Sequence, residues 1–475
     1  MKLPNCFPDD TDAYKVTQHL LQKKELNGIY SYGEHRKGAQ YPASMFFGAQ
    51  IICIDHFVGE VVTKENVQYA QDKAGHRFGT PKYFNRKMYD YIINKYGGML
   101  PVRIKAVKEG TLVPINNVLF TMESLDDKCI PLVKHMETMF MQNWYPSTVC
   151  TNSFYGKRDT LKHLIKSGTP ESINFKWADF GNRACSGQEQ AARGGAAHLV
   201  HFNTSDTQVA DRAVDFYYGT KEGSILKSVI ASEHADALQY GPGEGEYEYV
   251  HACLDAAPDD AIVSIVIDTF DQDNFIDNVL TREDIKIRIV SRAGITVPRQ
   301  DSGDPKEKTL RNLNSLSISY GWAQNNKGYR VINPKLNVLQ GDGMQRSTID
   351  ELYTHIEDNK WSSDNLLPGS GSGTLVKGFE RDTQRMAIKP SQMSFTDRGE
   401  VNVCKEVKSQ PDKRSKTGRL KLHDAGGAFM TLSSADMPKE QFAGYIDSLE
   451  TIFENGELKR KQTFDEVREI AAGYL

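Results

Sequence analysis

Short apolar runs rich in β-branched residues recur along the second half of the chain and decide its predicted architecture. Each run is four to eight residues long, which is typical of strands buried on both faces of a sheet. In chain order they are HLVHF (198–202), AIVSIVID (261–268), IKIRIVSR (285–292), GITVP (294–298), LNVLQ (336–340) and NLLP (365–368). We expect most of them to be strands of one sheet.

Helical segments lie between several of these runs. One covers residues 306–324 and another covers 347–359, where apolar side chains repeat at helical spacing (Ile349, Leu352, Tyr353 and Ile356). Ser347 followed by Asp350 predicts a variant of the N-terminal capping box. Strands that alternate with helices predict βα units around a largely parallel sheet.

Polar residues follow the predicted strands at their carboxyl ends. Asp268 closes one run, Arg299–Gly303 follows GITVP, and Gly341–Gly343 and Gly369–Gly373 follow the last two. Active sites lie at these strand ends in an α/β barrel, but an open doubly wound sheet also binds ligands there. The pattern therefore predicts where a site lies and leaves both architectures open.

The two ends of the chain have a different pattern. Residues 101–123 alternate apolar and polar positions around turn signals, as in an antiparallel unit. Residues 132–145 predict a helix that is buried on most sides. After about Pro390 short strands and turns follow, with a basic run, KRSKTGRLKL, at 413–422. These ends predict mixed α and β structure outside the parallel sheet.

Composition narrows the class of function. The 475-residue chain is 39% hydrophobic and 25% charged, with a formal net charge of -4, which argues against a dedicated nucleic-acid binder. No apolar run approaches the roughly 20 residues of a membrane helix, and acidic residues stand where a signal peptide has its apolar core. Seven scattered cysteines form no CxxC pair. We therefore expect a cytoplasmic protein with reduced thiols, without a membrane or a nucleic acid as its partner.

The stretch Asp179–Thr207 combines an aromatic residue, an arginine, small residues and a final carboxylate. In wording and order it resembles the nicotinate/nicotinamide phosphoribosyltransferase family (the type II phosphoribosyltransferases), and within it the members that use nicotinamide. The resemblance extends from FPDDTDAYKVT (7–17) to FDEVREIAAGYL (464–475), nearly the whole chain. Four later segments carry it too: SVIASEH (228–234), VPRQDSGDP (297–305), LQGDG (339–343) and PGSGSG (368–373).

The resemblance implies an α/β fold, in which an irregular α/β barrel accompanies a mixed α+β domain built from the N- and C-terminal segments. The implied boundaries are 1–150 for the N-terminal part of the mixed domain, 151–389 for the barrel and 390–475 for the C-terminal part. It also implies a reaction, the transfer of the phosphoribosyl group of phosphoribosyl pyrophosphate to nicotinamide with Mg²⁺. ATP would be an activating co-substrate, and the enzyme would be a homodimer with shared active sites.

Three residues are candidates for a slot that holds a pyridine ring. Phe180 and Arg183 present an aromatic face and a guanidinium plane, which both stack on such a ring, although the pair alone also fits a core phenylalanine beside a surface arginine. Asp206 would accept a hydrogen bond from a carboxamide and repel a carboxylate, or it would cap a helix. The resemblance implies that Phe180 and the partner subunit's Tyr14 stack on the two ring faces, while Asp206 reads the amide.

The resemblance also implies a catalytic group of four residues. A neutral imidazole is nucleophilic near pH 7, so His234 is a candidate for phosphorylation by ATP, although a lone histidine is more often structural. By this resemblance Asp268 and Asp301 lie near Mg²⁺ and pyrophosphate, and carboxylates suit this ion. Arg299 is expected to contact both the base and a phosphate. The other implied substrate-binding residues are Ser228, Ser264, Gly341, Asp342, Gly371, Ser372, Arg381, Lys389, Lys405 and Lys413.

The sequence departs from the family pattern at three positions. Ser372 stands where a glycine is expected, Ala387 where a serine is expected, and Asn182 where animal members have an aromatic residue. The sequence has no GxxxxGK[ST] motif, so a P-loop is not expected to hold ATP. Two alternatives stay open: a nicotinate phosphoribosyltransferase with the same phosphate chemistry, and a non-catalytic protein that binds a phosphoribosyl ligand or a nucleotide.

Overall fold

The computed structural model describes residues 5–409 and 414–475, which form two compact units. The first unit takes the chain up to Thr151, the short segment Phe216–Gly219 and the segment from Phe379 to Tyr474. The second, here called the barrel unit, takes Asn152–Asp215 and Thr220–Gly378. The boundary at Thr151 falls within the long helix α6 (Trp144–Ser167).

The barrel unit is built on a parallel sheet of six strands. Every pairing within this sheet is parallel, as the alternation of apolar runs and helices predicts. In spatial order the strands are β6 (Ala178–Asp179), β13 (Leu366–Ser370), β12 (Val338–Gln340), β9 (Thr296–Gln300), β8 (Val263–Val266) and β7 (Ile230–Ala231).

Two isolated bridges connect the edges of this sheet. Asp179 at the end of β6 pairs with Ser205, and the neighbouring Thr204 pairs with Lys227, just before β7; both bridges are parallel. The strands therefore close into a ring, and the prediction of an irregular α/β barrel is confirmed. The closure is irregular because single bridges replace a full ladder at this point.

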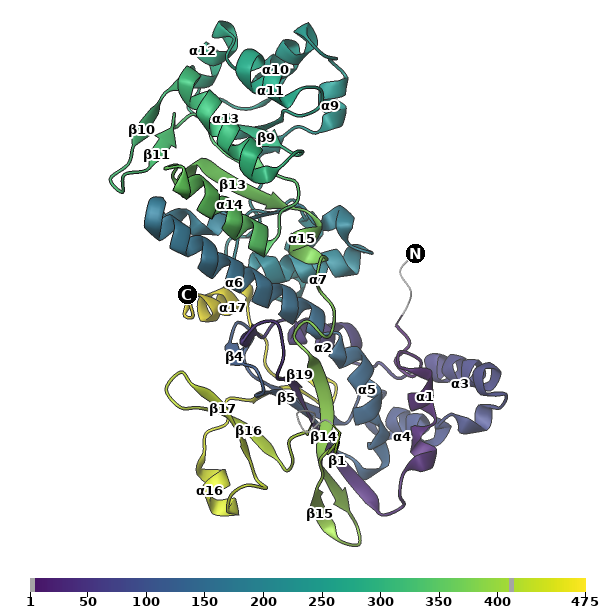
Figure 1. The fold of residues 1–475 in the computed structure, drawn as a ribbon. Helices are drawn as coiled ribbons and strands as arrows, with labels where there is room; N and C mark the ends of the chain where they lie inside the picture. Colours follow the sequence, from purple (N-terminus) through teal and green to yellow (C-terminus); the bar gives the residue numbers. More distant parts are fainter. Residues whose placement is uncertain (1–4, 410–413) are drawn as a thin grey trace. The chain divides into compact units, whose positions relative to one another are not determined.

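Helices follow the strands and surround the sheet (Figure 1). The two helices expected from periodicity are confirmed as α13 (Pro305–Tyr320) and α14 (Arg346–Asp358), which pack against each other. The predicted span of the first, 306–324, was too long, because residues 322–324 form a strand. The others are α7 (Gln188–Leu199), α8 (Gln208–Tyr217), α9 (His234–Leu238), α10 (Glu244–Ala256), α11 (Gln272–Asn274), α12 (Glu283–Ser291) and α15 (Ser372–Leu375). A hairpin of β10 (Trp322–Gln324) and β11 (Arg330–Ile332) follows α13.

Three local predictions were wrong. IKIRIVSR forms most of α12, because Ile285 and Ile289, four residues apart, are buried while Ile287 between them is 58% exposed. HLVHF forms the end of α7 and the turn after it, and the bridging segment at 203–205 comes later. The capping box of α14 uses Gln345 and Thr348 instead of Ser347 and Asp350.

The first unit contains a seven-stranded sheet made from both ends of the chain, and its hydrogen-bonded strand pairs are antiparallel. The predicted antiparallel unit at 101–123 is confirmed by β3 and β5. The spatial order is β15 (Gly399–Asn402), β14 (Met386–Phe395), β1 (Leu26–His35), β5 (Val118–Ser124), β3 (Val102–Ala106), β18 (Glu450–Glu454) and β19 (Glu457–Leu458). Mixing of N- and C-terminal strands confirms the predicted α+β domain.

Two small hairpin sheets and several helices complete the first unit. The sheets pair β2 (Ala43–Met45) with β4 (Leu112–Pro114) and β16 (Leu420–Asp424) with β17 (Phe429–Ser433). The helices are α1 (Ala13–Val16), α2 (Ala49–His56), α3 (Lys64–Phe78), α4 (Arg86–Tyr96), α5 (Pro131–Met141), α16 (Lys439–Gly444) and α17 (Phe464–Ala472).

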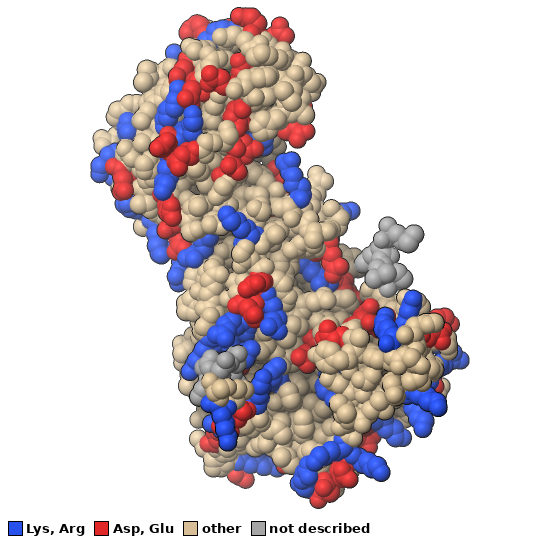
Figure 2. Space-filling model, turned by 45° about the vertical axis from the view of Figure 1, so that its right-hand side comes forward, with Lys and Arg blue, Asp and Glu red and all other residues tan. Residues whose placement is uncertain are grey.

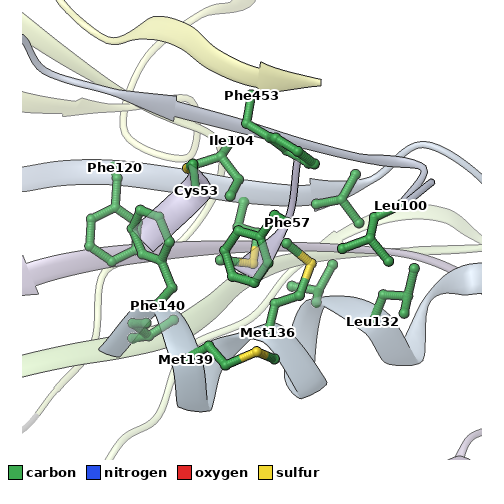
Figure 3. Packing of buried hydrophobic residues seen from close by; sticks show 14 of the residues in the cluster. Cys53, Phe57, Leu100, Ile104, Phe120, Leu132, Met136, Met139, Phe140 and Phe453 are labelled. Carbon is green, nitrogen blue, oxygen red and sulfur yellow. The ribbon is translucent and has the colours of Figure 1, made fainter. Parts of the chain in front are cut away.

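Helix α5 packs on the seven-stranded sheet through a core of aromatic and methionine side chains (Figure 3). Phe57 lies in the middle, with its ring centroid 6.3 Å from that of Phe140 on α5 and 6.0 Å from that of Phe453 on β18. Phe120 of β5 meets Phe140 edge to face at 4.6 Å. Such aromatic pairs stabilise the fold beyond the contribution of buried apolar area. They also join strands from both ends of the chain in one core.

The charge pattern matches the near-neutral composition. Acidic and basic side chains are interspersed over the face seen in Figure 2, in agreement with a formal net charge of -4. Within residues 5–409 and 414–475, no helix combines the length and the apolar character that crossing a membrane requires.

Candidate functional site

A cavity of about 990 Å³ opens in the barrel unit where the parallel strands end. Its lining comes from the loops after β6, β9, β12 and β13 and from the start of α9. Nine of the residues proposed from the sequence line it: Phe180, Arg183, Asp206, His234, Arg299, Asp301, Gly341, Gly371 and Ser372. The carboxyl ends of the barrel strands therefore bring the separate motifs together.

Phe180 is held in place by the strand beside it. Its backbone N–H donates to the carbonyl of Ser370 at 2.8 Å. Its ring lies against Gly369, where an added Cβ would come within 2.1 Å of the ring. Arg183 follows on a short 3₁₀ turn, Asn182–Ala184, and is exposed. The glycine at 369 thus makes room for the aromatic wall of the cavity.

Asp206 lies on the segment that closes the barrel, directly after the bridging residue Ser205. Its side chain is exposed, and one carboxylate oxygen accepts a hydrogen bond from the Ser228 hydroxyl at 2.5 Å. Its backbone N–H donates to the carbonyl of Asp179 at 2.9 Å. The backbone position of Asp206 is therefore tied directly to the residue before Phe180.

Asp179 is a buried carboxylate between these two segments, and the sequence interpretation did not single it out. Its Oδ1 accepts from the Gly181 N–H at 2.8 Å, and its Oδ2 accepts from the Ser205 hydroxyl at 3.1 Å. Burial raises the pKa of Asp179 to about 6, although these hydrogen bonds act in the opposite direction. Its position at a strand end, directly before the DFGNR aromatic, was the available signal.

His234 begins α9 and faces a carboxylate. Its Nε2 lies 3.1 Å from Oδ1 of Asp268, whose side chain is only 4% exposed, while the imidazole is 44% exposed. When Nε2–H donates to this carboxylate, the neutral ring carries its free electron pair on Nδ1. The geometry therefore leaves one ring nitrogen available as a nucleophile.

Asp301 and Gly341 follow the neighbouring strands β9 and β12, and the position of the Asp301 carboxylate depends on the absence of a side chain at Gly341. A Cβ at Gly341 would lie 2.6 Å from Oδ1 of Asp301, so the small residue leaves room for the carboxylate. The Gly341 N–H donates to the carbonyl of Gln300 at 2.9 Å. Below them Gln300 and Gln340 are buried and hydrogen-bonded to each other, and Gln340 also donates to the Asp342 carbonyl at 2.9 Å.

The remaining predicted residues lie outside the cavity lining. Ser264 is buried within β8 and Asp342 is exposed on the loop after β12. Ser228 contacts the cavity residue Asp206, and Asp268 contacts His234. Four belong to the first unit (Tyr14, Arg381, Lys389 and Lys405), and Lys413 lies outside the described residues.

Two of the residues in the first unit have informative surroundings. Tyr14, on α1, is 60% exposed and lines a hollow of about 410 Å³ together with Lys15 and Glu137. Lys389, on β14, is partly buried, and this burial lowers its pKa.

The carboxylates do not form a metal cluster by themselves. Among residues 5–409 and 414–475, no group of three or more His, Cys, Asp or Glu side chains is arranged to hold a metal ion. Asp268 and Asp301 offer carboxylate oxygens, which are the type of donor that Mg²⁺ prefers.

Several lining residues were not predicted as site residues. They are Asn182, Ala184, Cys185, Gly187, Gln188, Glu233 and Ala235. All lie within or next to the motif segments 179–207 and 228–234, so their proximity to the proposed residues was the available signal. What the sequence lacks is the direction of each side chain.

Comparisons with known proteins agree with the resemblance. The family model described as "Nicotinamide phosphoribosyltransferase, N-terminal domain" matches residues 7–104. The one described as "Nicotinate phosphoribosyltransferase (NAPRTase) family" matches residues 175–457.

Two curated relatives are both named nicotinamide phosphoribosyltransferase. The one from Xanthomonas campestris pv. campestris is 34% identical over 469 residues, which covers 97% of this chain and 96% of the relative. The one from Acinetobacter baylyi is 28% identical over 397 residues, which covers 80% of this chain and 77% of the relative.

Two solved structures share the fold. The nicotinate-nucleotide pyrophosphorylase from Pyrococcus furiosus aligns with a TM-score of 0.61 and 12% identity, covering 100% of this chain and 97% of that one. The human nicotinic acid phosphoribosyltransferase aligns with a TM-score of 0.59 and 14% identity, covering 97% of this chain and 92% of that one.

Proposed function

The chain belongs to the nicotinate phosphoribosyltransferase (NAPRTase) family, and from this premise we propose that it makes nicotinamide mononucleotide for NAD salvage. The enzyme transfers the phosphoribosyl group of phosphoribosyl pyrophosphate to nicotinamide and releases pyrophosphate. The observation that carries the choice of nicotinamide is the carboxylate of Asp206, which lines the same cavity as Phe180 and Arg183. A carboxylate there accepts a hydrogen bond from the amide of nicotinamide and repels the carboxylate of nicotinate.

In the reaction, the electron pair of the pyridine nitrogen forms the new bond to C1 of the ribose. The bond from C1 to the pyrophosphate oxygen breaks, and its electrons leave with pyrophosphate. Positive charge develops on the sugar, so carboxylates near it stabilise the transition state, while cations stabilise the leaving group. Arg299, which lines the cavity, serves the second purpose.

Magnesium is part of this proposal. Asp301, and Asp268 partly through water, would hold an ion whose other ligands are water and substrate oxygens. Bound in this way, the ion would neutralise charge on the pyrophosphate.

We propose that ATP activates the enzyme by phosphorylating His234. The hydrogen bond between His234 and Asp268 supports this role, because the carboxylate orients the ring and leaves one nitrogen free. The electron pair of this free nitrogen forms a bond to the γ-phosphorus of ATP, and ADP departs with the electrons of the broken bond.

The working enzyme is proposed to be a cytoplasmic homodimer that binds small molecules. The family resemblance implies that Tyr14 and the basic residues Arg381, Lys389, Lys405 and Lys413 serve the partner's site. Tyr14, Arg381, Lys389 and Lys405 belong to the first unit, and Tyr14 is 60% exposed, which is compatible with donation to another subunit. Seven cysteines without a disulfide support a reducing compartment.

The experiment that tests the proposal measures mononucleotide formation from phosphoribosyl pyrophosphate and Mg²⁺, with nicotinamide or nicotinate, each with and without ATP. Product from nicotinamide alone supports the proposal. Product from nicotinate alone favours the nicotinate-using alternative, and binding without turnover favours a non-catalytic protein.

The Asp206→Asn variant tests the reason for the choice. The neutral amide removes the repulsion of nicotinate, so we expect the ratio of kcat/KM values, nicotinamide over nicotinate, to fall by at least about tenfold. Asp211→Asn, the same substitution on α8 and outside the cavity lining, is the matched control and should keep the preference for nicotinamide. An unchanged ratio in Asp206→Asn would exclude the reading role.

A further inference from the structure

Asp179 ends β6 directly before Phe180, and its side chain is completely buried. We propose that Asp179 is a positioning residue that sets the spacing between the two walls of the base slot, Phe180 and Asp206, and thereby the affinity and the selectivity for nicotinamide. The inference deepens the proposed function and rests on it.

One oxygen of Asp179 organises the wall that carries the aromatic ring. Oδ1 accepts from the Gly181 N–H at 2.8 Å, which fixes the turn on the far side of Phe180. The contact is close because residue 181 has no side chain: a Cβ there would lie 2.9 Å from this oxygen and 2.7 Å from Leu375. Phe180 is thus held from both sides, by this turn and by its own bond to Ser370.

The other oxygen organises the segment that carries Asp206. Oδ2 accepts from the Ser205 hydroxyl at 3.1 Å, and the same hydroxyl oxygen accepts from the Thr207 N–H at 3.0 Å. The Asp206 N–H also donates to the Asp179 carbonyl at 2.9 Å. The residues on both sides of Asp206 are therefore connected to the carboxylate of Asp179, and Asp206 is connected to its backbone.

A carboxylate suits this position better than its neutral isostere. It offers two acceptor oxygens, one for each wall, whereas an asparagine offers one acceptor and one donor. Holding the charge in a buried place is unfavourable, as the pKa raised to about 6 indicates. Packing alone would be served as well by an uncharged side chain, so the charge and the two acceptors point to a role in the site.

The charge also acts on selectivity. The carboxylates of Asp179 and Asp206 repel each other, which adds to the raised pKa of Asp179. A ring that carries a carboxylate would therefore meet the negative charge of Asp206, with the buried charge of Asp179 behind it, whereas a ring that carries an amide would meet an acceptor for its N–H groups.

The test compares kcat and KM for nicotinamide, nicotinate and phosphoribosyl pyrophosphate in the full-length enzyme and four variants. These are Asp179→Asn, Ser205→Ala, Ser205→Thr and the control Asp211→Asn. Asp211 lies on α8, outside the cavity lining, and accepts from a serine hydroxyl and a backbone N–H as Asp179 does. Thermal unfolding of each variant shows whether it is folded.

For Asp179→Asn we expect the KM for nicotinamide to rise about tenfold, while kcat falls by less than about threefold. The reason is that a poorly positioned slot binds the base less tightly both in the ground state and in the transition state. The preference for nicotinamide over nicotinate also falls in this variant, whereas the KM for phosphoribosyl pyrophosphate stays unchanged. Ser205→Ala changes the same quantities in the same direction by a smaller factor, Ser205→Thr restores them, and Asp211→Asn matches the wild type.

An Asp179→Asn enzyme with the wild-type KM and selectivity would overturn the inference, as would a Ser205→Thr enzyme as impaired as Ser205→Ala. If Asp179→Asn does not fold, the pair of Ser205 variants decides. Failure of the proposed function is seen separately, in the wild type: an enzyme that uses nicotinate alone overturns the proposed substrate, and the KM for nicotinate then decides whether Asp179 positions the slot. A wild type that uses neither base overturns both.

Discussion

At the scale of single residues, glycines control where the functional side chains lie. Gly369 makes room for the ring of Phe180, and Gly341 makes room for the carboxylate of Asp301. Glycines after β13 also allow backbone N–H groups to approach a phosphate closely. At Gly373 the structure adds a packing reason, because a Cβ there would come within 2.1 Å of the Met344 carbonyl oxygen.

Gly341→Ala tests this packing. The new Cβ would come within 2.6 Å of Asp301 Oδ1, so the carboxylate must move, and a displacement of about 1 Å in a catalytic group costs up to about a hundredfold in rate. We expect kcat to fall at least about tenfold. Gly444→Ala, on α16 and outside the cavity lining, is the matched control, since no atom lies within 4 Å of its Cβ, and it should retain most of the activity. Equal activity in the two variants would contradict this reasoning.

His234 offers a second test at this scale. Replacing the imidazole by alanine removes the nitrogen that the proposal assigns to phosphate transfer, so ATP should no longer stimulate His234→Ala, while slow synthesis without ATP persists. The measurement is the ratio of rates with and without ATP. Stimulation that survives the substitution would place the phosphorylated group elsewhere.

At the scale of elements, a charged cluster holds α6 against α14. Both ring nitrogens of His163, on α6, lie 3.0 Å from carboxylate oxygens of α14, Nδ1 from Glu357 and Nε2 from Asp350. Glu357 is buried and also accepts from Lys166 and Ser167. A neutral imidazole has one N–H, so only the protonated ring donates to both carboxylates.

The stability of the barrel unit should therefore depend on pH through His163. Burial acts to lower the pKa of His163, but the hydrogen bonds to Glu357 and Asp350 outweigh it, and the pKa is raised overall. The stabilisation is then fully present below the pKa of an unfolded histidine, about 6.5, and is lost as pH rises through the raised value in the folded protein.

The His163→Gln variant isolates this contribution. We expect it to be less stable than the wild type by about 1–2 kcal/mol near pH 6, since charge-assisted hydrogen bonds are lost, and the difference should shrink as pH rises. Thermal unfolding of both proteins from pH 5.5 to 9 measures it. His355→Gln, a substitution on the same helix α14 and outside this cluster, is the control. A difference in stability that stays constant over this range would show that the pKa of His163 is the same in the folded and the unfolded protein.

At the scale of the whole molecule, the residues proposed for one reaction belong to two units. The barrel unit carries the cavity and its carboxylates, while the first unit carries Tyr14 and the basic residues Arg381, Lys389 and Lys405. The sheet of the first unit unites strands from both ends of the chain. Because Tyr14 is proposed to serve the partner's site, mixing two variant enzymes can test whether the sites are shared.

Two inactive variants should complement each other if the sites are shared. Tyr14→Ala and Asp301→Asn each impair both sites of their own dimer. In a mixed dimer one site takes Asp301 from the first variant and Tyr14 from the second, so it is intact. Random exchange of subunits in an equal mixture would restore about a quarter of the wild-type activity. Dimers that exchange subunits without any gain in activity would show that Tyr14 serves its own chain.

The sequence by itself was sufficient for the parallel sheet, the two periodic helices and the segments that line the cavity. These depend on short stretches, where the spacing of apolar residues and the polar strand ends carry the information. The same signal failed at IKIRIVSR, because isoleucines at every second position fit a strand and isoleucines at every fourth fit a helix. There the burial of Ile285 and Ile289 decided for the helix.

Only the tertiary structure decided which side chains act together. Asp268 meets His234, Asp179 meets Ser205, and Asp301 meets the space left by Gly341. Each pair joins segments that are distant in the chain and become neighbours through strand order and barrel closure. A linear pattern specifies the end of each strand, but hydrogen bonds of about 3 Å depend on the register between strands and on side-chain direction, which form only when the barrel closes.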